Sequence, residues 1–563
     1  MSQKINVNAK ASNDVALHVN DYHQRTKHSL EKYAAGPETL DWSLQPDAFR
    51  TYAGARQIPL PLNANTITTA YADLYTRQKV PARTLNLENI ASLFEISLGL
   101  SAWKQYGPDK WALRCNPSSG NLHPTEGYLV HWDNSFLASE LETGVYHYRS
   151  DEHSLEQRCL ISNEISTTLT SQAGTQQGFV IGLSSIHWRE AWKYGERAYR
   201  YCQLDVGHAI AAISYAAATL GWSVMQLDNA SDQEIDTLLG LKDEASFSQA
   251  EKEHPDVLLY ISNAAVEDES VMLSLLKQLC DFPGDVQWQG EANRLDRHPM
   301  YKWPIIGQAA AATHKPQTTK LKNPYTLDAD IITQDQNKTE IQASQLIKQR
   351  RSAQAFDPKH ELPLETFYAM LDKILPRNIT PWNSIHLTPH IHPVFYVHRV
   401  SGLTPGLYAM PRYAAAKEML QAQMRSEFTW QSVKDCPQHI PLYELVNANS
   451  MNAARKLSCH QPIASDSAFC VSMLAEFNAV LQQGEWNYRY LHWEAGMLGH
   501  VLYLEAEAEN FRGTGIGCFF DDAVHQILGI ENNDLQVIYH FTVGTPIVDN
   551  RLITTPPYSH LKR

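Results

Sequence analysis

Apolar residues fall at helical spacing between Leu87 and Leu98, where Ile90, Leu93 and Phe94 recur every three or four positions. This pattern predicts a helix. Shorter apolar runs at residues 126–132, 144–148 and 179–183 are typical of strands. A further helix should begin near Leu364. The chain therefore mixes helices and strands, as an α+β protein does.

The strongest pattern is an internal repeat. Tyr199-Arg200-Tyr201, followed by Asp205 and Gly207, opens one long apolar segment, and Tyr488-Arg489-Tyr490, followed by Glu494 and Gly496, opens another. The spacing is constant, since 488 − 199 and 496 − 207 are both 289. Repeats at a fixed spacing indicate repeated structural units. We expect two central helices, at residues 199–221 and 488–513, that are hydrophobic nearly all round.

The repeat extends on both sides of these helices. Downstream, small helices ending at 238–241 and 527–530 each precede an apolar strand, at 257–261 and 537–541. Upstream, His123-Pro124 and Tyr146 are echoed by His392-Pro393 and Tyr408. We interpret the chain as two copies of one α+β fold.

Composition shifts divide the chain further. Residues 1–61 read as an N-terminal arm and irregular wrap, 62–300 as the first domain, and 345–563 as the second. Residues 301–344 are rich in Ala, Gln, Thr, Lys and Pro with little periodicity, which is typical of a linker. Such a linker would let the two copies pack face to face.

Charge and cysteine content exclude several classes of function. A formal net charge of −14 argues against binding to a nucleic-acid backbone. The N-terminus is polar and no run of 18 uncharged apolar residues occurs, so we expect a cytoplasmic protein with no membrane contact. Eight cysteines without a Cys-x-x-Cys pair indicate neither a zinc site nor a disulfide framework, and no metal ligands are predicted.

The chemistry is expected in the stretch from Arg114 to Pro124. Two prolines and a glycine exclude regular structure, so Pro117-Ser118-Ser119-Gly120-Asn121 should form a loop with exposed backbone N–H groups. The strand at 126–132 would hold this loop on a rigid element. An ordinary Asn-Pro turn is the alternative.

This stretch resembles the flavin-contacting loop of the nitroreductase superfamily, and more narrowly its SagB/ThcOx-type branch, which includes azoline dehydrogenases. The resemblance implies FMN as cofactor. It also implies flavin contacts from the following residues: Arg114, Pro117, Ser118, Ser119, Gly120 and Asn121.

The second copy carries the other expected cofactor contacts. Arg350-Arg351-Ser352 resembles the family's FMN-phosphate motif, although Gln354 replaces a usual second arginine, and residues 76–83 of the first copy match it poorly. Forked guanidinium donors suit phosphate oxygens. The glycine-rich turn at 513–520, with Gly515, Ile516 and Gly517, is the expected contact to the flavin ring, and a dinucleotide-binding fold is the rival interpretation. Arg551 is a further candidate phosphate contact; an exposed arginine is the alternative.

The motifs are thus divided between the copies. Single-copy members of the superfamily are homodimers that bind FMN between subunits, so this chain resembles such a dimer fused into one polypeptide. One complete site, built from both halves, and one degenerate pseudo-site are expected.

Lys193-Tyr194 precedes the first central helix and has no counterpart in the second copy. The pair resembles the catalytic pair of azoline dehydrogenases, in which a desolvated lysine acts as base and the tyrosine relays a proton. A helix-entry lysine beside a packed tyrosine is the alternative.

The leading hypothesis is an FMN-dependent oxidoreductase that oxidises a small molecule or peptide, with an azoline ring as one candidate substrate. NAD(P)H-dependent reduction of nitro compounds or quinones is the enzymatic alternative. A non-catalytic peptide-binding or assembly subunit is the third.

Overall fold

The computed structural model describes residues 17–76, 79–133, 137, 141–173, 177–264, 269–281, 286–319, 327, 341–386 and 388–562. Three parts of the sequence predictions lie outside these residues: positions 1–16 of the arm, most of 320–340 in the linker, and positions 77–78 of the weak phosphate motif.

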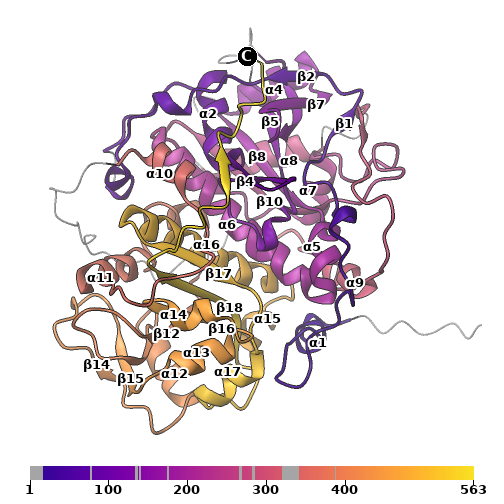
Figure 1. The fold of residues 1–563 in the computed structure, drawn as a ribbon. Helices are drawn as coiled ribbons and strands as arrows, with labels where there is room; N and C mark the ends of the chain where they lie inside the picture. The colour runs from indigo at the N-terminus through magenta and orange to yellow at the C-terminus, as the bar shows by residue number, and fades with distance from the viewer. Residues whose placement is uncertain are drawn as a thin grey trace, which may run out of the picture.

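Two seven-stranded antiparallel sheets form the framework (Figure 1). In spatial order the first contains β2 (Gln57–Pro59), β7 (Ser154–Leu160), β6 (Gly144–Arg149), β5 (Thr125–His131), β8 (Gly178–Ser185), β10 (His254–Ser262) and β9 (Ser223–Gln226). The second contains β14 (Gln431–Ser432), β15 (Tyr443–Asn447), β13 (Gly406–Ala409), β12 (Ile391–Val397), β16 (Phe469–Glu476), β18 (Leu535–Gly544) and β17 (Arg512–Ile516). The two orders correspond strand for strand, so the predicted repeat of one α+β fold is confirmed.

The correspondence reaches single side chains. Tyr146 in β6 donates its hydroxyl to the Glu142 carbonyl at 2.7 Å, and Tyr408 in β13 donates to the Thr404 carbonyl at 2.6 Å. Both acceptors lie four residues before the tyrosine. Tyr146 and Tyr408 are therefore equivalent residues, and they set which residue of the first sheet corresponds to which residue of the second.

The predicted smaller elements are present. The helix at 87–98 is α2 (Leu87–Ser97), capped by the Asn86 side chain, and the helix near Leu364 is α11 (Leu364–Lys373). The small paired helices are α7 (Asp232–Leu238) and α17 (Asp521–Leu528). The other α-helices are α1 (Val19–Arg25), α4 (Asn163–Ala173), α5 (His187–Tyr194), α8 (Glu269–Asp281), α9 (Pro304–Ala312), α10 (Ala343–Gln349), α12 (Ala416–Gln423), α13 (Met451–Leu457), α14 (Pro462–Asp466) and α15 (Asn478–Leu481).

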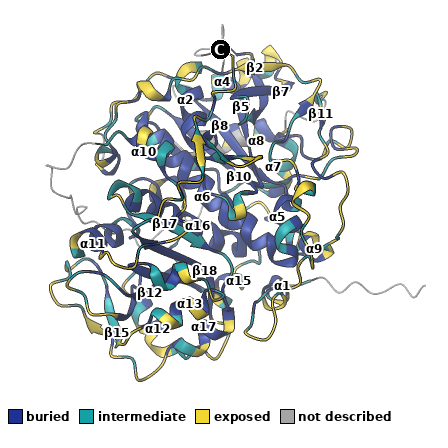
Figure 2. Cartoon of the chain, in the orientation of Figure 1, coloured by how far each residue is buried: buried dark blue, intermediate teal, exposed yellow. Residues whose placement is uncertain are grey.

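Two long helices, α6 (Ala198–Thr219) and α16 (Asn487–Ala508), run through the middle of the molecule and are buried on nearly all sides (Figure 2). The first matches its predicted range closely. The predicted end of the second, at residue 513, is wrong. Asn510 has a left-handed φ of 60°, which ends the helix, and the following residues pair with β18 as strand β17.

The two long helices touch at equivalent glycines. A Cβ on Gly207 would lie 2.2 Å from the Trp493 carbonyl oxygen, and a Cβ on Gly496 would lie 2.2 Å from the Leu204 carbonyl oxygen. Any larger residue would push the helices apart. The repeated glycines are therefore the contact point between the two halves.

Reciprocal ion pairs reinforce this contact. Arg200 of α6 pairs with Asp521 of the second half at 2.8 Å, and Arg489 of α16 pairs with Asp232 of the first half at 2.6 Å. Both aspartates occupy the first position of a short helix, α17 or α7, and all four side chains are buried. The halves pack as a pseudo-dimer within one chain.

Peripheral segments tie the halves together. β19 (Ile553–Thr555), near the C-terminus, pairs with β3 (Leu100–Tyr106) of the first half, which also pairs with β4 (Asp109–Arg114). Helix α9 lies inside the stretch predicted as a linker, because Pro304 starts a short alanine-rich helix. Strand β2 lies in the predicted arm but pairs with β7 of the first sheet. The domain boundaries predicted at 61/62, 300/301 and 344/345 remain proposals.

Among the described residues no helix is long and apolar enough to cross a membrane.

Candidate functional site

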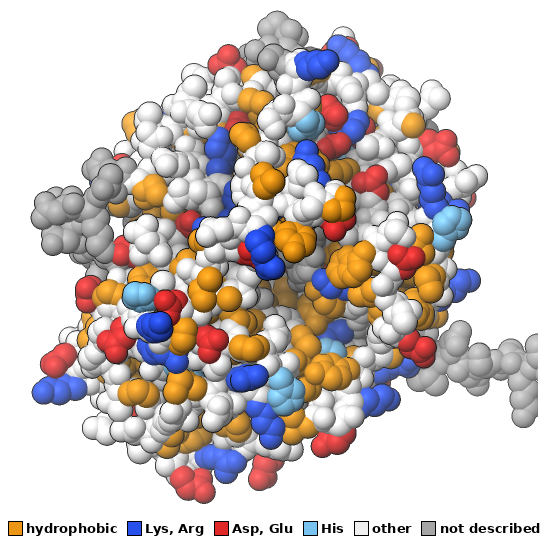
Figure 3. Space-filling view, in the orientation of Figure 1, with side chains coloured by type: hydrophobic (Ala, Val, Ile, Leu, Met, Phe, Trp, Pro, Cys, Tyr) orange, Lys and Arg blue, Asp and Glu red, His pale blue; other side chains and the backbone are white. Residues whose placement is uncertain are grey.

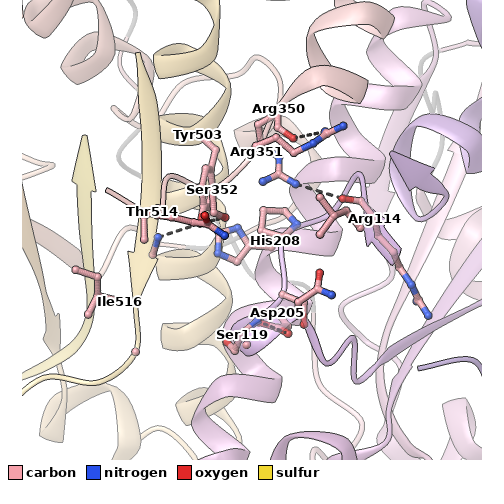
Figure 4. A pocket seen from close by; sticks show the side chains of 18 of the residues that line it. Arg114, Ser119, Asp205, His208, Arg350, Arg351, Ser352, Tyr503, Thr514 and Ile516 are labelled. Carbon is pink, nitrogen blue, oxygen red and sulfur yellow. Dashed lines mark hydrogen bonds between the residues drawn. The ribbon is translucent and has the colours of Figure 1, made fainter. Parts of the chain in front are cut away.

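A pocket of about 420 Å³ lies between the two halves, and Figure 3 shows the molecular face hollowed near its middle. Its walls come from α6 and the loop after β4 on one side, and from β17 and the segment after α10 on the other (Figure 4). We call it the composite pocket. Among the residues predicted for the cofactor, these line it: Arg114, Pro117, Ser118, Ser119, Gly120, Asn121, Arg350, Arg351, Ser352, Gly515, Ile516 and Gly517.

The loop at 117–121 is shaped by left-handed backbone. Gly120, Asn121 and His123 have φ values of 58°, 60° and 53°. The loop is held internally, because the His123 N–H donates to Ser118 Oγ at 2.8 Å and Asn121 Nδ2 donates to the Ala112 carbonyl at 2.8 Å. These bonds pre-order the loop with no ligand contact required.

Asp205 of α6 anchors the loop from below. Its carboxylate accepts hydrogen bonds from the Ser119 N–H at 3.0 Å and from Ser119 Oγ at 2.9 Å. The Ser119 N–H is therefore not free, contrary to the expectation of exposed N–H groups. Burial raises the pKa of Asp205 to about 7, although the bonds from Ser118 and Ser119 oppose that shift. The pocket thus contains a carboxyl group that titrates near neutral pH.

Arg350 and Arg351 bring positive charge to the opposite side. Arg350 donates to the Arg114 and Cys115 carbonyls, and Arg351 donates to the Lys348 carbonyl at 2.8 Å. Within the described residues neither guanidinium has a carboxylate at ion-pair distance, and the buried Arg350 Nε has no hydrogen-bond partner. Burial lowers the pKa of Arg351 to about 10 and lowers that of Arg350 as well. Arginines that are removed from water and lack a carboxylate at ion-pair distance favour binding of an anionic ligand.

Ser352 lies beside these arginines at the edge of β17. The Tyr503 hydroxyl is 2.9 Å from Ser352 Oγ and also accepts the Gly515 N–H at 2.9 Å. Tyr503 therefore links the phosphate-motif candidate to the glycine-rich segment.

The glycine-rich segment is an edge strand and not the predicted turn. Arg512 to Ile516 pair with β18 in regular antiparallel register. A Cβ on Gly515 would lie 1.8 Å from Tyr539 Oη, and one on Gly517 would lie 2.1 Å from Tyr201 Cε1. Glycine is required because aromatic side chains of both halves approach the backbone closely.

Lys193 and Tyr194 stand at the end of α5, against the loop. A Cβ on Gly120 would lie 2.5 Å from Tyr194 Oη and 3.0 Å from Lys193 Nζ. Tyr194 lines the composite pocket, and the Lys193 ammonium faces the Trp42 ring at 5.1 Å. Burial lowers the pKa of Lys193 and raises that of Tyr194 well above its usual value. Of the pair, Tyr194 lines the pocket, and Lys193 lies against the loop at Gly120.

Two predicted contacts are engaged elsewhere. The Arg551 side chain is 72% exposed and pairs with Asp549 at 2.7 Å. The Arg114 guanidinium donates to the Ala48 and Thr125 carbonyls, so this residue meets the pocket while its charged end points away (Figure 4).

Sequence reasoning missed several residues that line the pocket. Asp205, His208, Tyr503 and Tyr539 were not predicted as site residues, and His208 Nε2 lies 3.1 Å from the Tyr539 hydroxyl. The one available signal was the substitution of Glu494 for Asp205 in the repeat, which distinguishes the two halves.

The repeat also locates the position equivalent to the composite pocket, beside α16 instead of α6. We call this position, around Glu494, Arg412 and Trp382, the filled counterpart. Glu494, the equivalent of Asp205, pairs there with Arg412 and accepts the His390 N–H at 2.9 Å. The Arg412 guanidinium lies 4.8 Å from the Trp382 ring. All these side chains except that of His390 are buried.

Sheet register explains the rest of the filling. Aligning Tyr146 with Tyr408 through the ladders makes Gln226 of β9 the equivalent of Gly515 of β17. The Gln226 side chain donates to the Tyr490 hydroxyl at 2.8 Å. At this position the composite pocket has Gly515, which has no side chain, and the counterpart has the hydrogen-bonded side chain of Gln226.

The model of the Nitroreductase family matches residues 77–249 and 347–545, together more than half of the chain. The chain belongs to the nitroreductase family. The two matched regions of this nitroreductase-family chain correspond to the two halves described above.

Individual relatives agree. The putative nitroreductase MJ1384 of Methanocaldococcus jannaschii is 26% identical over 140 residues, which are 24% of this chain and 68% of that protein. A putative nitroreductase from Anabaena variabilis superposes with a TM-score of 0.66 at 23% identity, covering 94% of this chain and 99% of that one. This superposition shows that the fold extends over both halves. A chain of the E. coli microcin synthetase complex aligns with 44% of this chain and 92% of that one at 17% identity, with a TM-score of 0.27.

Proposed function

We propose that this nitroreductase-family chain is an FMN-dependent oxidoreductase with one cofactor site per chain, the composite pocket. The observation that carries the proposal is the pair of arginines that line the pocket, the buried Arg350 and the half-buried Arg351, neither of which has a carboxylate at ion-pair distance in the described part of the chain. A phosphate would supply the missing negative charge.

The residues present fit FMN at both ends. Arg350, Arg351 and Ser352 would hold the phosphate, while β17 and the 117–121 loop would hold the flat ring between glycine backbone and loop. A volume of about 420 Å³ lies in the usual range for small-ligand pockets. The bound flavin would supply two-electron redox chemistry, and the protein would supply position and charge.

The Lys193–Tyr194 pair would handle the proton. Because burial lowers the pKa of Lys193, this amine loses its proton more readily than a free lysine and is the candidate base. The Tyr194 hydroxyl, which faces the same loop, would orient the substrate or relay the proton. The Trp42 ring lies 5.1 Å from the Lys193 ammonium, as a cation–π contact.

We narrow this proposal to oxidation of a small molecule or peptide, with an azoline ring as the favoured substrate, because a base beside the flavin loop suits removal of a ring proton. Reduction of a nitro compound or quinone by NAD(P)H is the enzymatic alternative, in which the same pair would donate a proton. A non-catalytic peptide-binding subunit is the third candidate.

Cofactor analysis of the purified protein tests the proposal. Absorbance and mass spectrometry of the released small molecule should identify FMN at one equivalent per chain. A protein that neither retains FMN nor binds added FMN would support the non-catalytic alternative. Two equivalents per chain would contradict the single composite site.

Turnover assays then separate the reactions. Flavin reduction by an azoline-containing peptide under anaerobic conditions is expected, whereas rapid reduction by NAD(P)H with quinone turnover would favour the alternative. Lys193→Met should keep flavin and lower the rate of flavin reduction at least tenfold. Lys359→Met, at an exposed lysine, is the matched control and should leave both unchanged.

A further inference from the structure

Two cysteines face each other at the edge of the composite pocket. Cys459 follows helix α13, and Cys518 follows Gly517 and lines the pocket. Their Sγ atoms are 2.6 Å apart and share a hydrogen bond, and neither residue is fully buried. Five of the other six cysteines are buried singly in the core.

Flanking bonds hold the two segments together. The Phe520 N–H donates to the Leu457 carbonyl at 2.8 Å, and Gln461 Nε2 donates to the Cys518 carbonyl at 3.4 Å. One of these bonds lies on each side of the cysteine pair. The sulfurs are therefore brought face to face by the backbone, and a bond between them needs little rearrangement.

The surroundings favour a thiolate at Cys518. His28 is hydrogen-bonded to this thiol, and its Nδ1 accepts the Ala34 N–H at 2.9 Å, so the neutral ring carries its proton on Nε2 and can donate it. Arg197, which donates to the Gly517 carbonyl, adds positive charge. The hydrogen bond shared with Cys459 lowers the pKa of Cys518 to about 5 and raises the pKa of Cys459. Cys518 is thus the nucleophile of the pair and Cys459 its proton-bearing partner.

We propose that Cys459 and Cys518 form a redox-active dithiol at the rim of the composite pocket, which small-molecule disulfides oxidise to an intramolecular disulfide. The Cys518 thiolate attacks one sulfur of the oxidant, forms a mixed disulfide and releases one thiolate. Cys459 then loses its proton to water, and its sulfur attacks Cys518 Sγ and releases the second thiolate. Two protein thiols are oxidised by two electrons, and the oxidant is reduced to two thiols.

Oxidation would act on the pocket directly. Cys518 lines it next to Gly517, whose position depends on close contact with Tyr201. The disulfide removes the thiolate charge and ties this edge of the pocket to the segment after α13. The redox state of the pair would therefore adjust ligand binding in the pocket.

Thiol counting and peptide mapping test the proposal on the full-length protein, with glutathione disulfide as the probe. Under native conditions at neutral pH, oxidation should remove two of the eight thiols and yield one cross-linked peptide joining Cys459 to Cys518. Cys459→Ser should instead retain glutathione on Cys518, because the second step is lost. Cys518→Ser should give neither product.

Cys436→Ser is the matched control, because Cys436 is also partly exposed, and its partners among the described residues are the Ile440 carbonyl at 3.7 Å and Tyr368 and not another cysteine. It should form the cross-link like the unaltered protein. If the unaltered protein keeps all eight thiols under glutathione disulfide, or if Cys459→Ser carries no adduct at Cys518, the proposal is overturned. Disulfide formation needs no flavin, so this result is separate from that of the cofactor analysis.

Discussion

The composite pocket and the filled counterpart occupy equivalent positions on the two sides of α6 and α16, yet the side chains beside the equivalent helix carboxylates, Asp205 and Glu494, differ. Both sit beside the same pair of crossing helices and next to equivalent strands, β17 and β9. In the pocket, Arg350 and Arg351 lack carboxylate partners among the described residues, while Arg412 in the counterpart pairs with Glu494. Glu494 is the equivalent of Asp205, so each side has a carboxylate at this helix position: Glu494 pairs with an arginine of the protein, whereas Asp205 holds the backbone of the 117–121 loop.

The two sides also differ in the size of the residues at equivalent positions. The glycine of β17 that meets Tyr539 is replaced by Gln226, and the 117–121 loop is replaced by a segment that brings in Trp382. Asp205 is replaced by Glu494, whose carboxylate pairs with Arg412. A few side chains thus distinguish the two sides.

Arg412→Ala should have the largest effect on stability. Removing one partner of a buried ion pair leaves Glu494 charged and unpaired, and the free energy of unfolding should fall by about 3–5 kcal/mol. Chemical denaturation measures this loss. Flavin content should stay at one equivalent per chain, and a gain or loss of flavin would contradict the assignment of this side as core.

Asp205→Asn should remove a pH dependence. The folded state holds a proton on Asp205 up to about pH 7, while the unfolded state releases it near the ordinary aspartate pKa of 3.8, so Asp205 destabilises the fold as pH rises between these values. From pH 5 to pH 7 the protein should lose roughly 2–3 kcal/mol that the variant keeps. Denaturation of the cofactor-free protein at both pH values measures the difference. Asp522→Asn, at an exposed carboxylate, should retain the dependence.

Arg351→Ala should weaken FMN binding without abolishing folding, because the side chain is only partly buried and bonds mainly to carbonyls. Loss of one charge-assisted contact is expected to cost about 1.5–3 kcal/mol, or roughly 10- to 150-fold in Kd. Titration of the cofactor-free protein with FMN gives the value. Unchanged affinity would remove Arg351 from the phosphate site.

Arg551→Ala should have the smallest effect. Its guanidinium is exposed and pairs with Asp549 on the surface, where such pairs contribute little. FMN affinity within about twofold of the unaltered protein is expected in the same titration. A loss as large as that of Arg351→Ala would return Arg551 to the phosphate site.

The sequence predicted the parts of this architecture that local pattern encodes. The 289-residue register, the helix at Leu87 and the strands at 126–132, 144–148, 179–183, 257–261 and 537–541 follow from local pattern, and the Pro117–Asn121 loop follows from its prolines and glycine. The end of α16 and the nature of β17 could not be read in this way. Glycines at 513 and 515 favour a turn locally, but pairing with β18 overrides that preference.

Contacts between distant segments account for the remaining surprises. Nothing near Asp205 in the sequence indicates that it holds the Ser119 backbone, since the two are 86 residues apart. The pairing of Arg412 with Glu494 and the meeting of Cys459 with Cys518 are likewise products of the fold. Chemistry assembled across a chain in this way becomes visible only when the coordinates are known.

The exchanged arginines of the central helices have a consequence for how the molecule comes apart. Arg200 of the first half pairs with Asp521 of the second, and Arg489 of the second half pairs with Asp232 of the first. If the halves separated, each would therefore expose an unpaired arginine and an unpaired aspartate on a hydrophobic surface. We therefore expect that neither half folds independently and that the whole chain unfolds in a single cooperative transition.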